Sequence, residues 1–223
     1  MLKSFLIIII LPIFTFASQI VLVVAKDSTT NKAKLQRFYD GKKVGHSIDV
    51  NIGKNGLGLG ISDISIEFDT KVSKREGDKK APLGIFKLTS VFGYDESLNI
   101  DMPYIHATKD LICVDDSNSK YYNHIINMPS NKPDSFEYMR RDDEQYKLGV
   151  VVEHNKKQIK NGGSCIFLHI QKAKDAPTAG CTSMRYEDLK TLVEWLDFEK
   201  NPVLIQVDRK NLSKVKTLYR LDP

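Results

Sequence analysis

The chain of 223 residues contains only three cysteines, at positions 113, 165 and 181, and a single tryptophan. Because three is an odd number, at least one thiol stays unpaired even if the other two form a disulfide. The sequence has no Cys-x-x-Cys pair and no histidine-rich stretch of the kind that holds metal ions. We therefore expect neither a metal site nor another cofactor.

Strong charge of one sign is also lacking. The net charge is +5, a mild basic excess spread among many acidic residues. No basic stripe with interleaved aromatic residues is present, so nucleic acid is not an expected partner. The chain also has no internal repeat and no linker rich in glycine, proline or serine. Residues 18–223 are therefore expected to form one domain, which is long enough to bury a substantial core.

The N-terminal segment has the features of a secretory signal. Lys3 gives it a positive start, residues 5–14 are apolar, and small residues precede the expected cleavage after Ala17. Removal of residues 1–17 takes away one lysine and no acid, which lowers the net charge from +5 to +4. The apolar stretch is short for a transmembrane helix, although an uncleaved anchor is the alternative. We expect export across the inner membrane to the periplasm or cell wall, without stable membrane insertion after cleavage.

Most of the predicted elements are β-strands. The turn signal Asp40-Gly41 lies between two strand-like segments and predicts a hairpin. Further apolar runs of strand length, rich in β-branched residues, occur at residues 20–24, 84–91, 149–153, 165–170 and 202–207. Their nearly continuous hydrophobicity indicates strands that are buried on both faces.

Two segments show helical spacing of apolar residues. Leu189, Leu192, Val193 and Leu196 predict a helix within residues 186–196. A weaker stripe in residues 211–223 predicts a tail that docks on the same domain, with a partner-binding helix as the alternative. The chain is therefore expected to be mainly β with α additions.

One histidine and one cysteine lie where nucleophilic catalysis would need them. His169 ends an apolar run, and Cys181 follows twelve residues later, directly after Gly180. A chain that doubles back between them brings the two together, and a neighbouring histidine favours the thiolate. We expect the amides of Gly180 and Cys181 to stabilise an oxyanion. For each residue alone, the alternatives are a disulfide-bonded cysteine and a buried core histidine.

Three motifs in a fixed order resemble the L,D-transpeptidase catalytic domain family, also called YkuD-like. They are Gly77-Asp78 followed by Pro82-x-Gly84-x-Phe86, the segment 149–155, and His169 followed by Thr178-x-Gly180-Cys181. Together they cover roughly residues 74 to 206. The resemblance implies a β-sandwich-like catalytic fold and enzymes that act on the stem peptides of peptidoglycan.

The resemblance also implies a reaction. The thiolate of Cys181 would attack an amide carbonyl of a stem tetrapeptide, with His169 as the base, and form a thioester acyl-enzyme. An acceptor amine would complete a transpeptidation, which we favour, whereas water would give L,D-carboxypeptidase activity. Two other classes are a non-catalytic wall-binding module and an exported cysteine peptidase that acts on proteins. The presence of both residues argues against the first, and the order of histidine before cysteine argues against the second.

Several residues near these motifs are candidates for substrate binding. Thr178 and Thr182 flank the nucleophile, where they either line the pocket or hydrogen-bond the turn. His154 and Asn155 follow a strand, where they either orient the substrate or end the strand. Members of the family often carry an arginine two residues after the cysteine. This chain has Ser183 there, and the nearest arginine is Arg185.

The remaining polar motifs are expected to play supporting roles. Asp78 and Lys80 are interpreted as structural residues of the loop before the strand 84–91. The polar segments 115–123 and 134–143 are expected to border the cleft, where their carboxylates would attract a protonated acceptor amine.

If Cys181 is free, Cys113 and Cys165 are left over. Cys165 lies in an apolar run, where cysteine often behaves as a small hydrophobic residue. We therefore favour two unpaired thiols over a disulfide. Replacement of either cysteine by alanine is accordingly expected to leave most of the activity intact.

Overall fold

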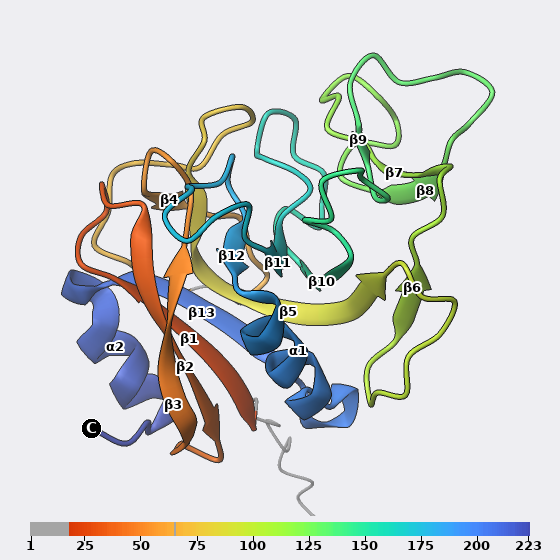
Figure 1. The fold of residues 1–223 in the computed structure, drawn as a ribbon. Helices are drawn as coiled ribbons and strands as arrows, with labels where there is room; N and C mark the ends of the chain where they lie inside the picture. Colours follow the sequence, from red (N-terminus) through yellow and green to blue (C-terminus); the bar gives the residue numbers. More distant parts are fainter. Residues whose placement is uncertain (1–17, 65) are drawn as a thin grey trace, which may run out of the picture.

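The computed structural model describes residues 18–64 and 66–223, so the expected signal segment 1–17 lies outside the described residues. Ten strands form a large sheet in the order β10-β11-β12-β3-β2-β1-β13-β5-β4, and β6 also pairs with β5 (Figure 1). Because β10 pairs with β5 as well, the sheet closes on itself. These strands are β1 (Gln19–Ala25), β2 (Lys32–Tyr39), β3 (Lys42–Asn51), β4 (Leu57–Leu59), β5 (Ala81–Gly93), β6 (Tyr104–His106), β10 (Leu148–Val152), β11 (Phe167–Ile170), β12 (Thr182–Met184) and β13 (Val203–Asp208).

The predicted hairpin is confirmed. β2 and β3 pair antiparallel around Asp40 and Gly41, whose φ angles are 46° and 80°. Two successive residues with positive φ are typical of the tight turn that matches the twist of a hairpin. Glycine is required at the second position, since an added Cβ would lie 2.6 Å from the carbonyl oxygen of Arg220.

Strands β1 and β13 form the parallel centre of the sheet, in the register Ile20↔Val203 to Ala25↔Asp208. All six residues of β13 are buried, in agreement with the burial predicted from the nearly continuous hydrophobicity of residues 202–207. The helix α2 (Arg209–Tyr219) follows β13 and packs on β13 and β1. Its first turn is capped by Asp208, whose carboxylate accepts a 3.1 Å hydrogen bond from the amide of Asn211. The C-terminal segment therefore docks on the same chain, as expected.

The helix predicted within residues 186–196 is also present, as α1 (Tyr186–Trp195). It packs on β10 and β11 and is followed by a 3-10 turn, η1 (Phe198–Lys200). Leu189, Leu192 and Val193 are buried at helical spacing. The described part of the chain is thus mainly β with two α-helices, which confirms the expected class. None of the helices in the described part of the chain is long and apolar enough to cross a bilayer.

A second, small sheet stands beside the large one (Figure 1). Its order is β8-β7-β9, from β7 (Leu111–Cys113), β8 (Ile125–Asn127) and β9 (Glu137–Tyr138), and long loops connect the three strands. A second hydrophobic cluster lies between the two sheets, and its members include Phe92, Met139, Tyr146, Phe167 and Cys181. The candidate nucleophile therefore lies at the junction of the two sheets.

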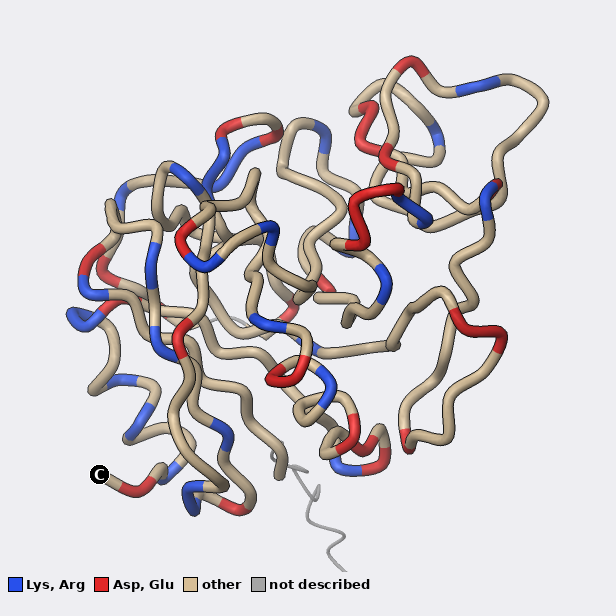
Figure 2. Tube along the Cα trace, viewed as in Figure 1, with Lys and Arg blue, Asp and Glu red and all other residues tan. Residues whose placement is uncertain are grey.

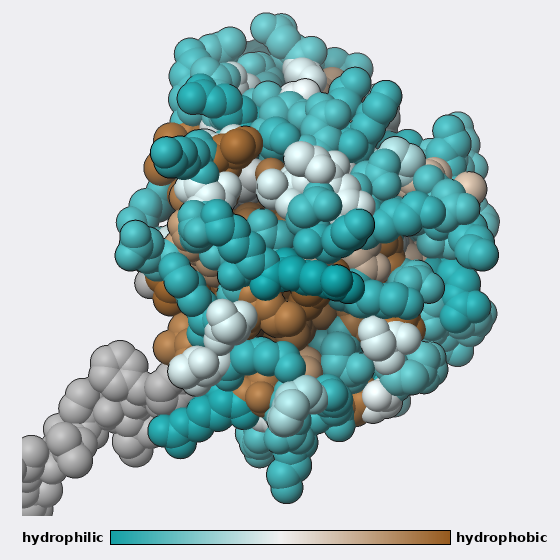
Figure 3. Space-filling view, turned by 90° about the vertical axis from the view of Figure 1, so that its left-hand side faces the viewer, coloured by the Kyte–Doolittle hydropathy of each residue, from teal (hydrophilic) through white to brown (hydrophobic). Residues whose placement is uncertain are grey.

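The surface shows no division by charge. Figure 2 shows lysine and arginine interspersed with acidic residues around the loops. On the face shown in Figure 3, hydrophobic residues gather in the middle and hydrophilic ones frame them. The interspersed charges agree with the mild net charge of the sequence.

Candidate active site

Strands β11 and β12 bring His169 and Cys181 to one face of the large sheet. The two strands are parallel, with Leu168 beside Thr182 and His169 beside Ser183. Cys181 immediately precedes β12. Because side chains alternate between faces along a strand, those of Cys181 and Ser183 lie on the face that His169 uses. The predicted pair is therefore brought together, and both side chains line the same cavity of about 310 Å³.

The thiol of Cys181 is a free thiol that is only 8 % exposed. Its sulfur accepts a hydrogen bond from the amide of Phe167 at 3.3 Å and donates one to the carbonyl of Cys165 at 3.4 Å. Burial raises its pKa to about 12, and the carboxyl group of Glu137 contributes to this increase. The Phe167 amide and the ammonium group of Lys74 act in the opposite direction, since both stabilise the thiolate.

The ring of His169 is oriented by the main chain. Its Nδ1 lies 2.8 Å from the carbonyl oxygen of Ile170, which accepts, so Nδ1 carries the hydrogen and Nε2 remains basic. Burial lowers the pKa of His169 to about 4. At neutral pH the site therefore holds a neutral thiol and a neutral imidazole, and the imidazole is in the form that accepts a proton.

One wall of the cavity carries charge. Asp115, Glu137, Arg141 and Tyr146 all line the cavity, and Glu137 belongs to β9 of the small sheet. The hydroxyl of Tyr146 donates a 2.5 Å hydrogen bond to Glu137, and its ring packs edge-on against His169. Burial raises the pKa of Glu137. The structure thus places residues of both predicted border segments on this wall.

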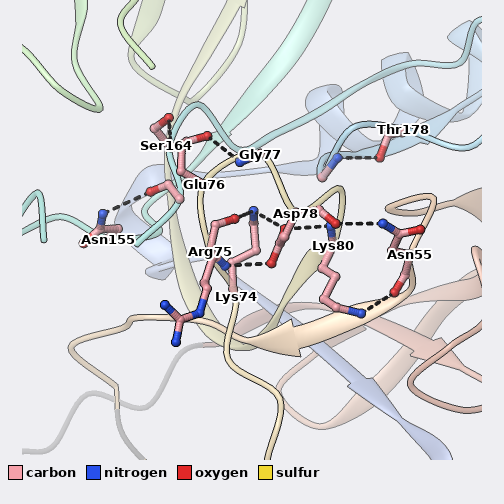
Figure 4. A network of polar contacts seen from close by, with 12 residues as sticks. Asn55, Lys74, Arg75, Glu76, Gly77, Asp78, Lys80, Asn155, Ser164 and Thr178 are labelled. Carbon is pink, nitrogen blue, oxygen red and sulfur yellow. Dashed lines mark hydrogen bonds and ion pairs between the residues drawn. The ribbon is translucent and has the colours of Figure 1, made fainter. Parts of the chain in front are cut away.

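The Gly77-Asp78 motif forms a tight loop (Figure 4), and Gly77 lines the same cavity as Cys181. The carboxylate of Asp78 accepts hydrogen bonds from Lys74 Nζ at 2.8 Å, from the Arg75 amide at 2.7 Å and from the Lys80 amide at 2.8 Å. Asp78 is therefore structural, as predicted. Lys74 is buried and lines the cavity, so the loop also brings one cation to the site.

Gly180 has the backbone conformation that its identity suggested, with φ at 156°. An added Cβ would lie 3.1 Å from the carbonyl oxygen of Lys80. Its amide donates to Thr178 Oγ1 at 3.1 Å, and that hydroxyl donates to the Cys181 carbonyl at 2.6 Å. Thr178 thus lines the cavity and also holds the turn. With the Gly180 amide already engaged, the Cys181 amide is the donor better placed to meet an oxyanion.

Two of the predicted substrate contacts, Thr182 and Arg185, lie away from this cavity. Thr182 points to the opposite face, where its hydroxyl donates to Gln206 at 2.7 Å in the core. Arg185 is exposed and pairs with Asp188 at 2.7 Å. Neither residue lines the cavity, which corrects the prediction for both. Ser183, at the position where arginine is frequent, is buried beside His169.

The predicted roles of His154 and Asn155 are corrected as well. His154 is 2 % exposed and packs edge-on against Phe86, and neither ring nitrogen has a partner among the described residues. Burial lowers its pKa to about 3. Asn155 is fully buried, and its side chain bonds the main chain of the 159–163 loop. Both residues end the strand and shape the loop, which was the alternative interpretation.

Cys113 and Cys165 form a disulfide, with their Cα atoms 6.0 Å apart, so the favoured interpretation of two unpaired thiols is wrong. The apolar run 165–170 led to the wrong prediction for Cys165 because the first two residues of the run are not part of the strand. Cys165 has a φ of 53°, in the left-handed region, and β11 begins only at Phe167. The sulfur of Cys165 is therefore directed toward the small sheet instead of continuing the strand pattern.

Four residues of the site were not singled out from the sequence: Lys74, Glu137, Arg141 and Tyr146. The charged run 134–143 was predicted to border the cleft. That pattern identifies the segment but does not indicate that Glu137 and Arg141 are the residues that reach the cavity. Lys74 and Tyr146 stand alone in polar stretches, and only the fold brings them to the cavity.

A family model agrees with this architecture. The model described as the L,D-transpeptidase catalytic domain, YkuD, matches residues 20–205. Because the match covers most of the chain, the protein belongs to the L,D-transpeptidase catalytic domain family. Members of this family are cysteine-dependent acyltransferases and peptidases of peptidoglycan. No curated protein and no solved structure matches the chain significantly.

Proposed function

We propose that the protein is a peptidoglycan L,D-transpeptidase that uses Cys181 as its nucleophile. The observation that carries the proposal is the placement of Cys181 and His169 on one face of β11 and β12, at one cavity of about 310 Å³. The acyl donor would be a stem tetrapeptide, attacked at the amide bond that follows the L-centre of its third residue. L,D-carboxypeptidase activity on the same tetrapeptide is the second candidate, since it begins with the same half-reaction.

The first half-reaction follows from the orientation of His169. With Nδ1–H donated to the Ile170 carbonyl, Nε2 takes the thiol proton as the sulfur of Cys181 attacks the amide carbonyl. The C–N bond breaks, the leaving D-amino acid takes the proton from His169, and a thioester remains. The Cys181 amide is the expected donor to the tetrahedral oxyanion.

The charge that develops on sulfur has support in the site. Both groups are neutral at rest, so proton transfer has to accompany attack and not precede it. The Phe167 amide, 3.3 Å from the sulfur, strengthens its interaction as negative charge appears. The buried ammonium of Lys74 acts in the same sense.

The second half-reaction decides between the two candidates. Asp115 and Glu137 place carboxyl groups on the cavity wall, where they favour the approach of a protonated acceptor amine over water. The amine first loses its extra proton to solvent, and His169 takes a second proton as the neutral amine attacks the thioester. The C–S bond then breaks, and His169 returns this proton to the Cys181 sulfur. This wall favours transpeptidation. With residues 1–17 acting as an export signal, the reaction would take place in the periplasm or cell wall.

Incubation of the protein with purified tetrapeptide muropeptides, followed by mass analysis, tests the proposal. We expect joined dimers, and exchange of the terminal D-alanine when a D-amino acid is added. Cys181→Ala should lose all turnover, because no other free thiol is present in the described chain. Tripeptide as the only product under both conditions would instead establish the carboxypeptidase.

Two further outcomes would contradict the proposal. Preferential cleavage of the last D-alanine from pentapeptides would indicate a D,D-enzyme. Turnover by Cys181→Ala at more than a small fraction of the wild-type rate would exclude the nucleophile. Digestion of casein, which we do not expect, would favour a protein peptidase.

A further inference from the structure

The disulfide joins the two sides of the candidate active site. Cys113 is the last residue of β7, the central strand of the small sheet. Cys165 lies two residues before β11, and its carbonyl accepts the hydrogen bond from the Cys181 thiol. In the described chain, the strands of the small sheet pair only with one another and not with the large sheet. The S–S bond is therefore a covalent link from the small sheet to the segment that holds the nucleophile.

The link acts on a residue of the cavity wall. In the register of β7 and β9, Cys113 lies directly beside Glu137. Asp115, the other carboxylate of this wall, follows Cys113 by two residues. Both wall carboxylates are thus attached to the half of the disulfide that belongs to the small sheet, while the thiol is attached to the other half.

Non-covalent contacts also join the two sides, and several of them involve the loop before β8. Asn123 donates to the carbonyls of His154 and Asn155 at 2.8 Å and 3.0 Å and accepts from the Cys165 amide at 2.9 Å. The hydroxyl of Tyr122 accepts from the Gly163 amide at 3.0 Å. These contacts attach the loop before β8 to the body of the protein. β9 contacts the body through the 2.5 Å hydrogen bond from Tyr146 to Glu137, and it is held in the small sheet by its pairing with β7.

The disulfide also borders a second hollow, separate from the cavity of the thiol. Cys113 and Cys165 both line this hollow of about 190 Å³, whose other lining residues include Asn123, His124 and Gln158. Cys165 lines this hollow as well as the cavity of Cys181, so it forms the partition between them. The two cysteines are only 1 % and 4 % exposed, so a reductant in the hollow reaches the disulfide when the surrounding side chains move, without passing the nucleophile.

We propose that Cys113 and Cys165 are positioning residues that hold the wall of Glu137 against the Cys181 cavity, and that reduction of their disulfide opens this wall. A dithiol supplies two electrons and two protons, the S–S bond breaks into two thiols, and the dithiol becomes a disulfide. β7 and β9 then move as a unit on their loops, and Glu137 leaves its place on the cavity wall. The consequence for turnover rests on the proposed function.

The test compares oxidised and dithiol-reduced protein. Hydrogen exchange followed by mass spectrometry should show lost protection at residues 111–113 and 137–138, with β1 and β13 unchanged. Labelling of Cys181 by a bulky maleimide, measured on its own peptide, should become about tenfold faster, because a wall that opens part of the time exposes the thiol. With muropeptides, KM should rise more than kcat falls, and reoxidation should restore all three readouts.

The double variant Cys113→Ala/Cys165→Ala serves as the control. It should resemble the reduced protein and should not respond to the dithiol, whereas the sequence alone had led us to expect little effect of these replacements. Unchanged exchange at 137–138 and unchanged labelling in fully reduced protein would overturn the proposal. Lost protection in β1 and β13 would overturn it equally, since the disulfide would then act on the whole fold. Exchange and labelling decide the matter even if no muropeptide is turned over, an outcome that would count against the proposed function alone.

Discussion

Tyr146 connects the acid of the cavity wall to the histidine of the catalytic pair. Its hydroxyl donates a 2.5 Å hydrogen bond to Glu137, while its ring lies edge-on against His169 with the ring centroids 5.3 Å apart. Burial raises the pKa of Glu137, and the hydrogen bond from Tyr146 opposes that increase because it stabilises the carboxylate. Tyr146 therefore influences both the protonation of Glu137 and the packing of the His169 ring.

We predict that Tyr146→Phe moves the acid side of the pH–activity profile to higher pH. The phenylalanine keeps the ring against His169 but removes the donor to Glu137, so the pKa of this carboxyl group rises further. We expect turnover near neutral pH to fall about tenfold, a decrease that corresponds to the free energy of one buried hydrogen bond. The measurement is the pH dependence of muropeptide turnover.

Tyr138→Phe is the matched control for this variant. Tyr138 lies in the same small sheet but is 44 % exposed and does not line the cavity. Its replacement should leave the profile in place. If Tyr146→Phe shifts the profile no more than Tyr138→Phe does, then the protonation of Glu137 has no part in the reaction.

Local patterns in the sequence were sufficient to predict the secondary-structure elements that carry the catalytic pair. A strand ending near His169, a glycine before Cys181 and a helix with Leu189 and Leu192 on one face all follow from the spacing of a few neighbouring residues. The structure contains each of these elements. The parallel register of β11 and β12 then places both side chains on one face without any further information.

The charged wall of the cavity could not be predicted in the same way. Glu137 reaches the cavity through the pairing of β9 with β7, and Tyr146 reaches it through the fold of the loop before β10. Neither residue has a local signal. The disulfide was missed because Cys165 adopts a left-handed conformation that breaks the strand pattern, and its amide bonds Asn123, which is distant in the sequence.

We predict that His169→Gln reduces turnover by about a thousandfold while the fold remains intact, since glutamine cannot take the thiol proton. The same variant should react more slowly with a small alkylating agent at neutral pH. At high pH the rates should converge, because hydroxide then removes the proton in both proteins. Rates measured for the Cys181 peptide check this, and equal rates at neutral pH would show that His169 does not activate the thiol.

We predict that His154 makes the protein less stable in acid. Its folded pKa is lowered to about 3, below the ordinary value of 6.5, so only the unfolded chain gains a proton between these values. Stability from the neutral ring is therefore fully present above pH 6.5 and declines as the pH falls towards 3. At pH 5 this amounts to about 2 kcal/mol.

Denaturant unfolding at pH 7 and pH 5 measures this effect. His154→Phe keeps an aromatic ring against Phe86 and removes the titratable group, so the drop between the two pH values should shrink by about 2 kcal/mol. His124→Phe, at an exposed histidine, should leave the drop as it is in the wild type. An equal drop in His154→Phe and the wild type would mean that His154 is not the group that titrates.

The last prediction concerns Lys74, whose ammonium group is buried with a side-chain exposure of 3 % and pairs with Asp78 at 2.8 Å. Lys74→Met leaves a carboxylate with two main-chain donors but no cation, so we expect a loss of about 3 kcal/mol, the lower end for a broken buried pair. Because the ammonium favours the Cys181 thiolate, its removal should also raise the pKa of the thiol and slow its alkylation severalfold.

Lys80→Met separates the charge effect on the thiol from a disturbance of the loop. Lys80 belongs to the same loop, but its Nζ donates to the Asn55 carbonyl at 2.7 Å near the surface, and it does not line the cavity. We expect its replacement to cost less than about 1 kcal/mol and to leave the alkylation of Cys181 unchanged. The double variant Lys74→Met/Asp78→Asn should recover part of the lost stability, because no buried charge is left unpaired, while the alkylation stays slow. If the double variant instead recovers the alkylation rate together with the stability, Lys74 acts by supporting the loop and not through its charge on the thiol.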